Sequence, residues 1–458
     1  MDLIRRLGAY LDSPTIPWKS LIITFSLGQY AIENYLAYRQ YQVLRRTTVP
    51  RQLASEVDAP THKKSQEYGR AKARFGAWSG AYNQLKNLLI ISYDAYPKLW
   101  VWSGALVAAY APARFSGEIT HSLVFVFAYA LAETIAGLPW SYYHHFVLEE
   151  SFGFNKQTLS LWVSDLVKGQ ALTFAFGIPL GAAFLKIIQS TGEKFFLYIW
   201  LFMLAVQLGA ISIFPTVITP LFNTLTPLPE GELRDRVHAL SNKLAFPLSE
   251  LQVIDGSKRS AHSNAYFTGL PFMNKKIVIY DTLIAKSSPA EVEAVLAHEL
   301  GHWKMSHTAK LLGISSAHLL YIFTLFGVFI NNKSLYEAFG FGGQLGQPIM
   351  IGFLLFNEVL SPTDSVVKLG MNVLTRKFEF EADAFSHQLG YAKELSAALI
   401  KLQIQNLSSM DADWLYSSYH YSHPILTERL KAVGWTSEKK ISGEGQGVVV
   451  GGGEKSEL

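Results

Sequence analysis

The sequence predicts a mainly α-helical, polytopic membrane protein with a smaller α+β domain on one side of the bilayer. Three observations favour this fold class. Hydrophobic residues make up 49% of the 458 residues, and the mean hydropathy of +0.17 is high for a soluble protein. Apolar runs long enough to cross a bilayer recur along the chain. Two longer polar segments between and after these runs carry helix and strand signals.

Seven apolar runs predict the transmembrane helices. They lie at about 20–37, 87–109, 121–140, 169–188, 195–221, 312–331 and 346–361. Any one of them, above all the short last run, could instead be a buried helix of a large globular core. Seven such runs together favour a membrane protein.

The spans divide the chain into parts. Residues 1–221 hold spans one to five with a basic loop at 38–86, and residues 312–361 hold spans six and seven. The polar parts 222–311 and 362–435 are expected to form one domain, and the Gly-rich segment 436–458 a disordered tail. The N-terminal segment shows no small-residue cleavage site, so the first span is expected to remain as an anchor.

Basic residues predict the orientation in the bilayer. The connection 38–86 carries ten lysines and arginines, whereas 111–121, 189–194 and 331–345 carry one each. The excess of positive charge is typical of the cytosolic side. We therefore expect a lumenal N-terminus, a cytosolic C-terminus, and both parts of the polar domain in the cytosol.

Ionisable side chains also occur within the predicted spans. The carboxylates are Glu33, Asp94, Glu133 and Glu358. Such groups are costly in lipid, so they either line a hydrated chamber between helices, or pair with one another and reach the interface.

The composition excludes some classes of partner and site. A net charge of +4 without a basic cluster is not typical of a nucleic-acid-binding protein, so no nucleic acid is expected as a partner. The chain has no cysteine, so a bound transition metal would need histidine and carboxylate ligands.

One helix carries a metal-binding pattern. Ser288 and Glu291 form a capping box with proline at the first helical position, which predicts a helix start. On that helix His298 and His302 are four residues apart, so both imidazoles lie on one face and can bind a single zinc ion. Glu299 is placed to take a proton from the attacking water. The alternative is an ordinary polar helix face.

The same segment does not supply the third ligand that catalytic zinc requires. Met305 and Thr308 stand where one class of zinc peptidases has glycine and histidine, and His307 is out of register with that class. Gly301 leaves room for close approach to the histidine face. The third ligand is therefore expected from a distant part of the chain.

A later charged segment, 376–383, offers that ligand. Glu379 and Asp383 lie one helical turn apart on one face, whereas Glu381 points about 200° away from Glu379. This favours Glu379 as the ligand and Asp383 as the acceptor that orients a ligand histidine. The alternative for Glu379 is a solvated charge. An even number of predicted crossings places Glu379 and the two histidines on the same side of the membrane.

Two further segments fit a peptide substrate. Segments 261–269 and 276–280 predict two strands around a turn that contains Pro271 and Asn274. An edge strand beside the zinc helix could bind an extended peptide, although an ordinary hairpin fits the pattern equally well. His423 could stabilise the oxyanion of a tetrahedral intermediate, or it could be structural.

Four motifs carry a resemblance to a known family. SNAYFTGLP, VLAHELGHWKMSH, RKFEFEADAF and SHPILTERL occur in this order. With the seven spans, they make the chain similar to the integral-membrane CAAX prenyl proteases, zinc endopeptidases of the a-factor-converting type in the endoplasmic reticulum and inner nuclear membrane. The resemblance implies seven helices around a water-filled chamber, closed on the cytosolic side by a gluzincin-like metalloprotease domain.

The resemblance also implies roles for individual residues. His298, His302 and Glu379 match the zinc ligands, and Glu299 matches the general base. Asp383 matches the carboxylate behind the ligands, Asn264 a substrate-strand position, and His423 and Arg429 a motif that lines the cleft. Where many members of the family have glutamine, this chain has Glu381.

The family's activity is removal of the C-terminal tripeptide from farnesylated CAAX proteins and, in fungi, a second cleavage in a mating-pheromone precursor. Two alternatives remain open at this point. One is a related membrane metallopeptidase that acts in quality control of membrane proteins. The other is a transporter or channel whose intramembrane carboxylates line a pathway and whose zinc site is structural.

Overall fold

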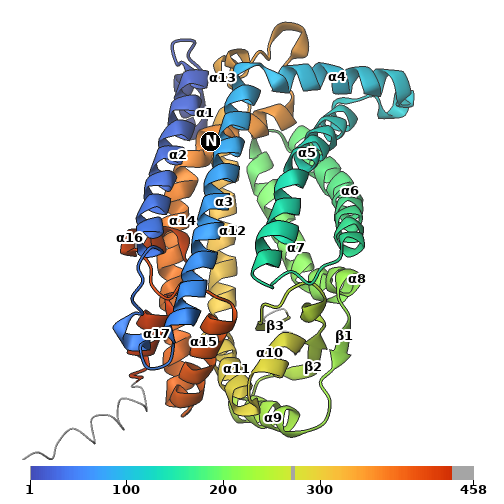
Figure 1. Ribbon diagram of the computed structural model, residues 1–458. Coiled ribbons are helices and arrows are strands. Elements are labelled where there is room, and N and C mark those ends of the chain that lie inside the picture. Colours follow the sequence, from blue (N-terminus) through green and yellow to red (C-terminus); the bar gives the residue numbers. More distant parts are fainter. Residues whose placement is uncertain (1, 270–273, 436–458) are drawn as a thin grey trace, which may run out of the picture.

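In the computed structural model, residues 2–269 and 274–435 are described, and they are mostly helical (Figure 1). Pro271 of the predicted turn and the predicted tail 436–458 lie outside these residues. The helices up to the sheet are α1 (Asp2–Leu11), α2 (Trp18–Val43), α3 (Ala59–Ser92), α4 (Ala95–Tyr110), α5 (Glu118–Tyr143), α6 (Leu159–Thr191), α7 (Phe195–Ile213) and α8 (Thr219–Phe222).

The remaining elements form the polar domain and the last membrane helices. The strands are β1 (Leu225–Pro227), β2 (Leu248–Ile254), β3 (Ala265–Thr268) and β4 (Lys275–Tyr280). The helices are α9 (Glu232–Leu244), α10 (Asp281–Lys286), α11 (Pro289–Lys304), α12 (His307–Phe329), α13 (Lys333–Ala338), α14 (Ile349–Gln388), α15 (Ala392–Gln405), α16 (Trp414–His420) and α17 (Leu426–Ala432).

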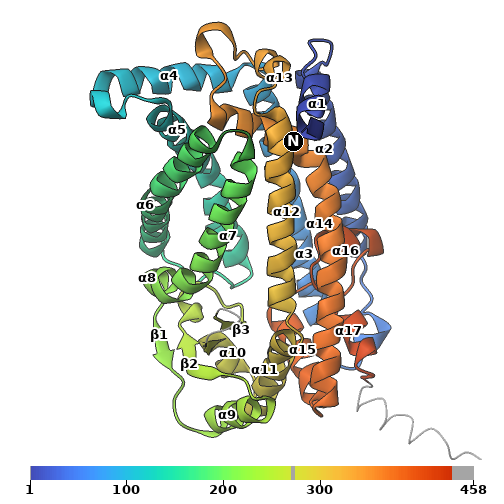
Figure 2. The same cartoon turned by 180° about the vertical axis from the view of Figure 1, so that it is seen from behind.

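Within the described residues, seven long helices form the elongated part of the molecule, and they run side by side in Figures 1 and 2. They are α2, α3, α5, α6, α7, α12 and α14. Neighbouring helices contact each other around a closed ring, in which α4 bridges α3 and α5 at the end opposite the sheet. Each of the seven predicted spans overlaps one of these helices.

By length and apolar composition alone, three helical stretches within the described residues could cross a membrane. They are Glu118–Glu149, Leu159–Phe222 and His307–Phe329. The second contains both α6 and α7, which are joined by a tight turn at 192–194. The other ring helices are assigned from their place in the ring, because their sequences are more polar.

The second predicted span, 87–109, is not a single helix. α3 begins at Ala59, inside the predicted loop 38–86, and supplies the crossing. Asp94 then has a φ of +53°, a left-handed conformation that non-glycine residues rarely adopt, and α4 turns away across the end of the ring. Hydropathy does not register such a break, because the apolar run continues through it.

Two neighbouring helices of the ring bury few of their side chains. α6 and α7 bury only Leu185, Ile188, Phe195 and Ile199, all near the turn that joins the two helices. A helix packed on a solid core would bury a stripe along its whole length. A large aromatic and aliphatic core closes this end of the ring, and the polar domain closes the other. Among the described residues, α6 and α7 are therefore packed mainly near the turn that joins them.

Three of the four predicted intramembrane carboxylates have a partner on another segment of the ring. Asp94 pairs with Lys19 at 2.7 Å, Glu133 pairs with Lys86, and Glu358 accepts a hydrogen bond of 3.4 Å from the Tyr96 hydroxyl. Pairing reduces the cost of placing a charge at membrane depth. These pairs thus join different segments of the ring.

The polar domain is built on a four-stranded sheet with the order β1-β2-β4-β3. β2 and β4 are parallel, and β3 pairs antiparallel with β4, so the predicted pair of strands is confirmed. β3 forms one edge of the sheet and contacts α11. The predicted capping box is also present, because the Ser288 hydroxyl and the Glu291 carboxylate each accept from the other's backbone N–H.

α11 packs closely on the lower part of α14, beyond the predicted span. The contact is made at Gly301, where an added Cβ would lie 3.1 Å from Phe385 Cδ1 and 3.3 Å from Ala382 Cα. The absence of a side chain at this position allows the two backbones to approach.

We predict that Gly301→Ala lowers the Tm in detergent. Overpacking at a close helix contact costs about 1–3 kcal/mol. The control is Gly313→Ala on α12, where an added Cβ meets nothing within 4 Å among the described residues. That change should be neutral or stabilise the helix by up to about 1 kcal/mol. A Gly301→Ala variant that melts at or above the wild-type temperature would show that the helices can separate here without cost.

Candidate metal centre

Two helices bring three ligand-type side chains to one point. His298 and His302 lie on the same face of α11, and Glu379 projects from α14. His302 Nε2 lies 3.3 Å from both His298 Nε2 and Glu379 Oε1, and His298 Nε2 lies 3.5 Å from Glu379 Oε2. One ligand atom from each residue falls within 4.8 Å of the others, so the three side chains could hold one metal ion.

The donor set fits a bound cation. Glu379 is 6% exposed, and its Oε2 atom accepts no hydrogen bond within the described residues, although it lies 3.5 Å from His298 Nε2 and 3.6 Å from Arg429 Nη1. A metal ion would satisfy this buried oxygen. Two imidazoles and one carboxylate are the ligands of many catalytic zinc sites, which keep a fourth position open.

The electrostatics of the site also favour positive charge between the ligands. Burial alone would raise the pKa of Glu379, but hydrogen bonds to the two histidines hold it far below its ordinary value. Burial and the charge of Arg429 would lower the pKa of His298, but Asp383 and Glu379 outweigh them and raise it to about 9.

Asp383 lies directly behind His298. Its side chain is fully buried, and Oδ1 lies 2.9 Å from His298 Nδ1. Arg429 donates from Nε to Oδ2 at 2.8 Å and from Nη2 to Oδ1 at 2.7 Å, a bidentate contact. The guanidinium of Arg429, a residue of the predicted cleft-lining motif, also lies 3.6 Å from Glu379 Oε2 through Nη1. Asp383 and Arg429 together fix the ring of His298 with Nε2 toward Glu379.

Glu299 lies beside the ligands on α11 and is partly buried. Burial raises the pKa of its carboxyl above the ordinary value, against the opposing effect of the two neighbouring histidines. A carboxylate with a raised pKa is a better proton acceptor near neutral pH than an exposed one.

His423 and Asn264 are the remaining predicted site residues. His423 Nε2 is 3.2 Å from Glu379 Oε1, and the His423 side chain is 66% exposed, so it reaches the ligands from an open side. Asn264 stands at the start of β3, and its side-chain Oδ1 accepts from the backbone N–H of Ala265 at 2.8 Å. All eight predicted site residues are thus found on α11, α14, the C-terminal segment and the edge strand.

Two contacts at the site were not predicted. His307 Nδ1 lies 3.0 Å from His302 Nδ1, and His307 Nε2 lies 2.9 Å from Glu381 Oε2. Helical spacing misses His307 because α11 ends at Lys304 and α12 begins at His307, with Ser306 between them at a φ of +57°. Spacing along one helix does not predict contacts across such a break.

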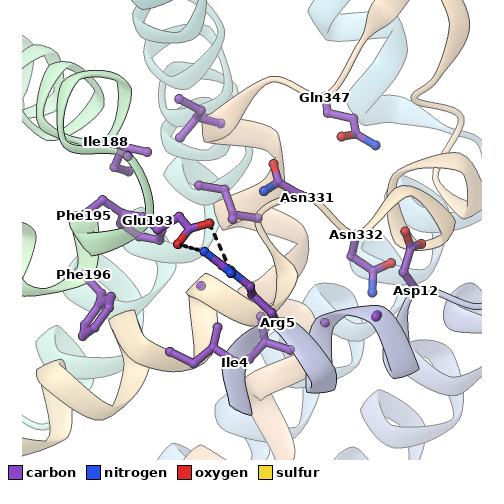
Figure 3. A pocket seen from close by; sticks show the side chains of 17 residues that line it. Ile4, Arg5, Asp12, Ile188, Glu193, Phe195, Phe196, Asn331, Asn332 and Gln347 are labelled. Carbon is purple, nitrogen blue, oxygen red and sulfur yellow. Dashed lines mark hydrogen bonds and ion pairs between the residues drawn. The ribbon is translucent and has the colours of Figure 1, made fainter. Parts of the chain in front are cut away.

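Two cavities show where a substrate could lie. One of 830 Å³ adjoins the site and is lined by His423, His262 and Tyr421, with residues of α2 and α3 on its other side. The other, of 560 Å³, lies at the opposite end of the molecule, where Arg5 of α1 pairs with Glu193 (Figure 3). No predicted site residue lines the second cavity, so we place the chemistry at the first.

A ring of membrane helices around a chamber, closed by a domain with a His-Glu-x-x-His helix and a distant glutamate, defines a membrane metalloendopeptidase. Family models support this class over most of the chain. Residues 40–224 match the model described as CAAX prenyl protease N-terminal, five membrane helices. Residues 227–436 match the model of peptidase family M48. The chain belongs to peptidase family M48.

Individual relatives resemble the chain over nearly its full length. CAAX prenyl protease 1 of Saccharomyces cerevisiae is 46% identical, over 95% of this chain and 99% of the relative. The CAAX prenyl protease 1 homolog of Homo sapiens is 41% identical, over 90% of this chain and 94% of the relative. The crystal structure of S. mikatae Ste24p has a TM-score of 0.88 and 44% identity, over 92% of this chain and 100% of that chain. These matches exclude the transporter or channel with a structural zinc site.

We predict that Glu379→Ala abolishes stoichiometric metal binding. The two remaining histidines cannot complete the ligand set of a catalytic site. Metal content per chain after purification measures the effect. Glu230→Ala is the control, because the Glu230 side chain is 94% exposed and its loss should leave the metal content unchanged. One bound ion per chain in Glu379→Ala would contradict the assignment of this ligand.

Proposed function

We propose that this chain is a zinc-dependent endopeptidase that removes the C-terminal tripeptide from farnesylated CAAX proteins. The observation that carries the proposal is the convergence of His298, His302 and Glu379 beside Glu299, next to a cavity and an edge strand. The relatives named CAAX prenyl protease support the substrate class. In this proposal Glu379 is the third zinc ligand, and Glu299 is the general base.

When bound, a zinc ion supplies Lewis acidity toward the scissile carbonyl and lowers the pKa of a water molecule. Glu299 accepts the proton of the attacking water and later delivers it to the leaving amine. His423, open to the cavity and 3.2 Å from Glu379, is placed to donate to the oxyanion. Asp383 and Arg429 hold His298 in the orientation that the ligand set requires.

The substrate strand is proposed to be β3. Its free edge faces away from β4, so an extended peptide can add to it through main-chain hydrogen bonds. Asn264 marks the start of this edge and is placed to contact the peptide. The prenyl chain is apolar, and the chamber above the site offers it an environment shielded from the cytosol.

We also propose that the protein resides in the membrane of the endoplasmic reticulum, and in the inner nuclear membrane, with a lumenal N-terminus and a cytosolic C-terminus. The excess of lysine and arginine in 38–86 supports this orientation. A second, N-terminal cleavage of a mating-pheromone precursor uses the same site.

A second candidate function is quality control of membrane proteins. The observation that favours it is the edge strand, because binding through main-chain groups does not select particular side chains. The chemistry would be identical, and the substrate would be any misfolded or stalled membrane chain.

We predict that Glu299→Gln lowers kcat on a farnesylated CAAX peptide by orders of magnitude while one metal ion per chain remains bound. General-base catalysis contributes about 10²–10⁴-fold, and glutamine keeps the shape of the side chain without accepting a proton. Peptide cleavage and metal content are measured on the same sample. Turnover equal to that of the wild type would refute Glu299 as the base.

We predict that removal of the farnesyl group from the peptide lowers kcat/KM at least tenfold. Burial of apolar surface contributes about 0.8 kcal/mol per CH₂, so the loss of a long apolar chain removes much of the binding energy. Matched farnesylated and unmodified peptides of one sequence provide the measurement. Equal kcat/KM for the two peptides would favour the quality-control function instead.

A further inference from the structure

The two histidines of the proposed zinc site are held in different ways. His298 contacts the Asp383 carboxylate directly through Nδ1. The Nδ1 atom of His302 instead faces the Nδ1 atom of His307, at 3.0 Å. His307 is 1% exposed, and its Nε2 atom lies 2.9 Å from Glu381 Oε2. Asp383 therefore contacts His298 directly, whereas Glu381 is linked to His302 through the imidazole of His307.

A break in the helix brings His307 to this position. On a continuous helix, a residue five positions after His302 would point about 140° away from it. Ser306 has a φ of +57°, which is uncommon for a residue other than glycine, and it separates α11 from α12. The change of direction between the two helices turns the ring of His307 back toward His302.

A second face of α14 receives the His307 ring. Phe378 and Glu381 are three residues apart, so they lie side by side on a face different from that of Glu379 and Asp383. The His307 ring stacks on Phe378, with centroids 4.0 Å apart and an angle of 5° between the planes. Stacking fixes the plane of the imidazole, and Glu381 fixes its rotation within that plane.

The hydrogen-bond chain determines which nitrogen of each ring carries a proton. An ionised carboxylate can only accept, so His307 Nε2 donates to Glu381. In the neutral ring, His307 Nδ1 then accepts, and the donor must be the Nδ1–H of His302. The lone pair of His302 is left on Nε2, the atom that faces His298 Nε2 and Glu379 Oε1.

We propose that His307 and Glu381 are positioning residues that hold His302 in the tautomer and orientation needed to bind the metal. This inference rests on the proposed zinc site and adds to it. His307 acts as a hydrogen-bond acceptor for His302, and Glu381 acts on His302 through His307. α14 thus supplies one ligand directly and orients both histidine ligands by two separate routes.

The experiment separates hydrogen bonding from packing. His307→Phe keeps a flat ring to stack on Phe378 but has no acceptor, whereas His307→Gln loses the stacked ring but offers an amide oxygen to His302. Zinc affinity is measured by competition with a chromogenic chelator, and ligand geometry by the visible spectrum of the cobalt-substituted protein. We expect about 10–100-fold weaker zinc binding and an altered cobalt spectrum for His307→Phe. His307→Gln should stay within a few-fold of the wild type and keep its spectrum.

The same contrast is made at Glu381, whose side chain is 35% exposed and tolerates substitution better than buried His307. Glu381→Gln keeps an acceptor and should bind zinc as the wild type does, whereas Glu381→Leu should bind about tenfold more weakly. Glu381→Gln and Glu381→Leu together test the proposal even when a His307 variant does not fold. Wild-type affinity and spectrum in His307→Phe or in Glu381→Leu would overturn the proposal.

These readouts do not require a substrate. Failure of the wild type to cleave farnesylated peptides would count against the proposed function, while the affinity differences would still test His307 and Glu381.

Discussion

The close packing of α11 on α14 is the constraint on which the site depends. Gly301 lets the two backbones approach, and the ligand carboxylate of α14 then faces both histidines of α11. A bulkier residue would move Glu379 and Asp383 outward together, because both are fixed to one rigid helix. The position of the third ligand, the orientation of His298 and the contact with His307 therefore all depend on one interhelical distance.

The ring above the site is stabilised differently from a globular core. At one end its helices pack around an aromatic core, and at the other end they adjoin the polar domain. Between these ends α6 and α7 bury few side chains. The ion pair of Lys86 and Glu133 joins α3 to α5, and the hydrogen bond from Tyr96 to Glu358 joins α4 to α14 beside the aromatic core. The carboxylates within these spans thus have structural partners in the ring, and a transport function is not required to explain their presence.

Much of the fold and most of the site follow from local rules that the sequence displays. Helical spacing places His298 and His302 on one face, and counting crossings brings Glu379 to the same side of the membrane. The features that could not be predicted involve single backbone dihedrals or distant partners. The left-handed conformations of Asp94 and Ser306 do not change the apolar pattern. The pattern therefore could not predict where α3 ends or that His307 contacts His302. The pairing of Arg429 with Asp383 depends on how α17 packs against α14, which spacing along the chain does not encode.

The path of the chain between the ligands has a consequence for biosynthesis. After α11, the chain ascends through α12, passes α13 at the far end of the ring, and returns through α14 before it reaches Glu379 (Figure 1). Domains are synthesised from the N-terminus onward. A nascent chain with the complete His-Glu-x-x-His helix but an unfinished final hairpin has neither the third ligand nor Arg429. With Glu379 as the proposed third ligand, the metal site is therefore incomplete until α14 has been synthesised.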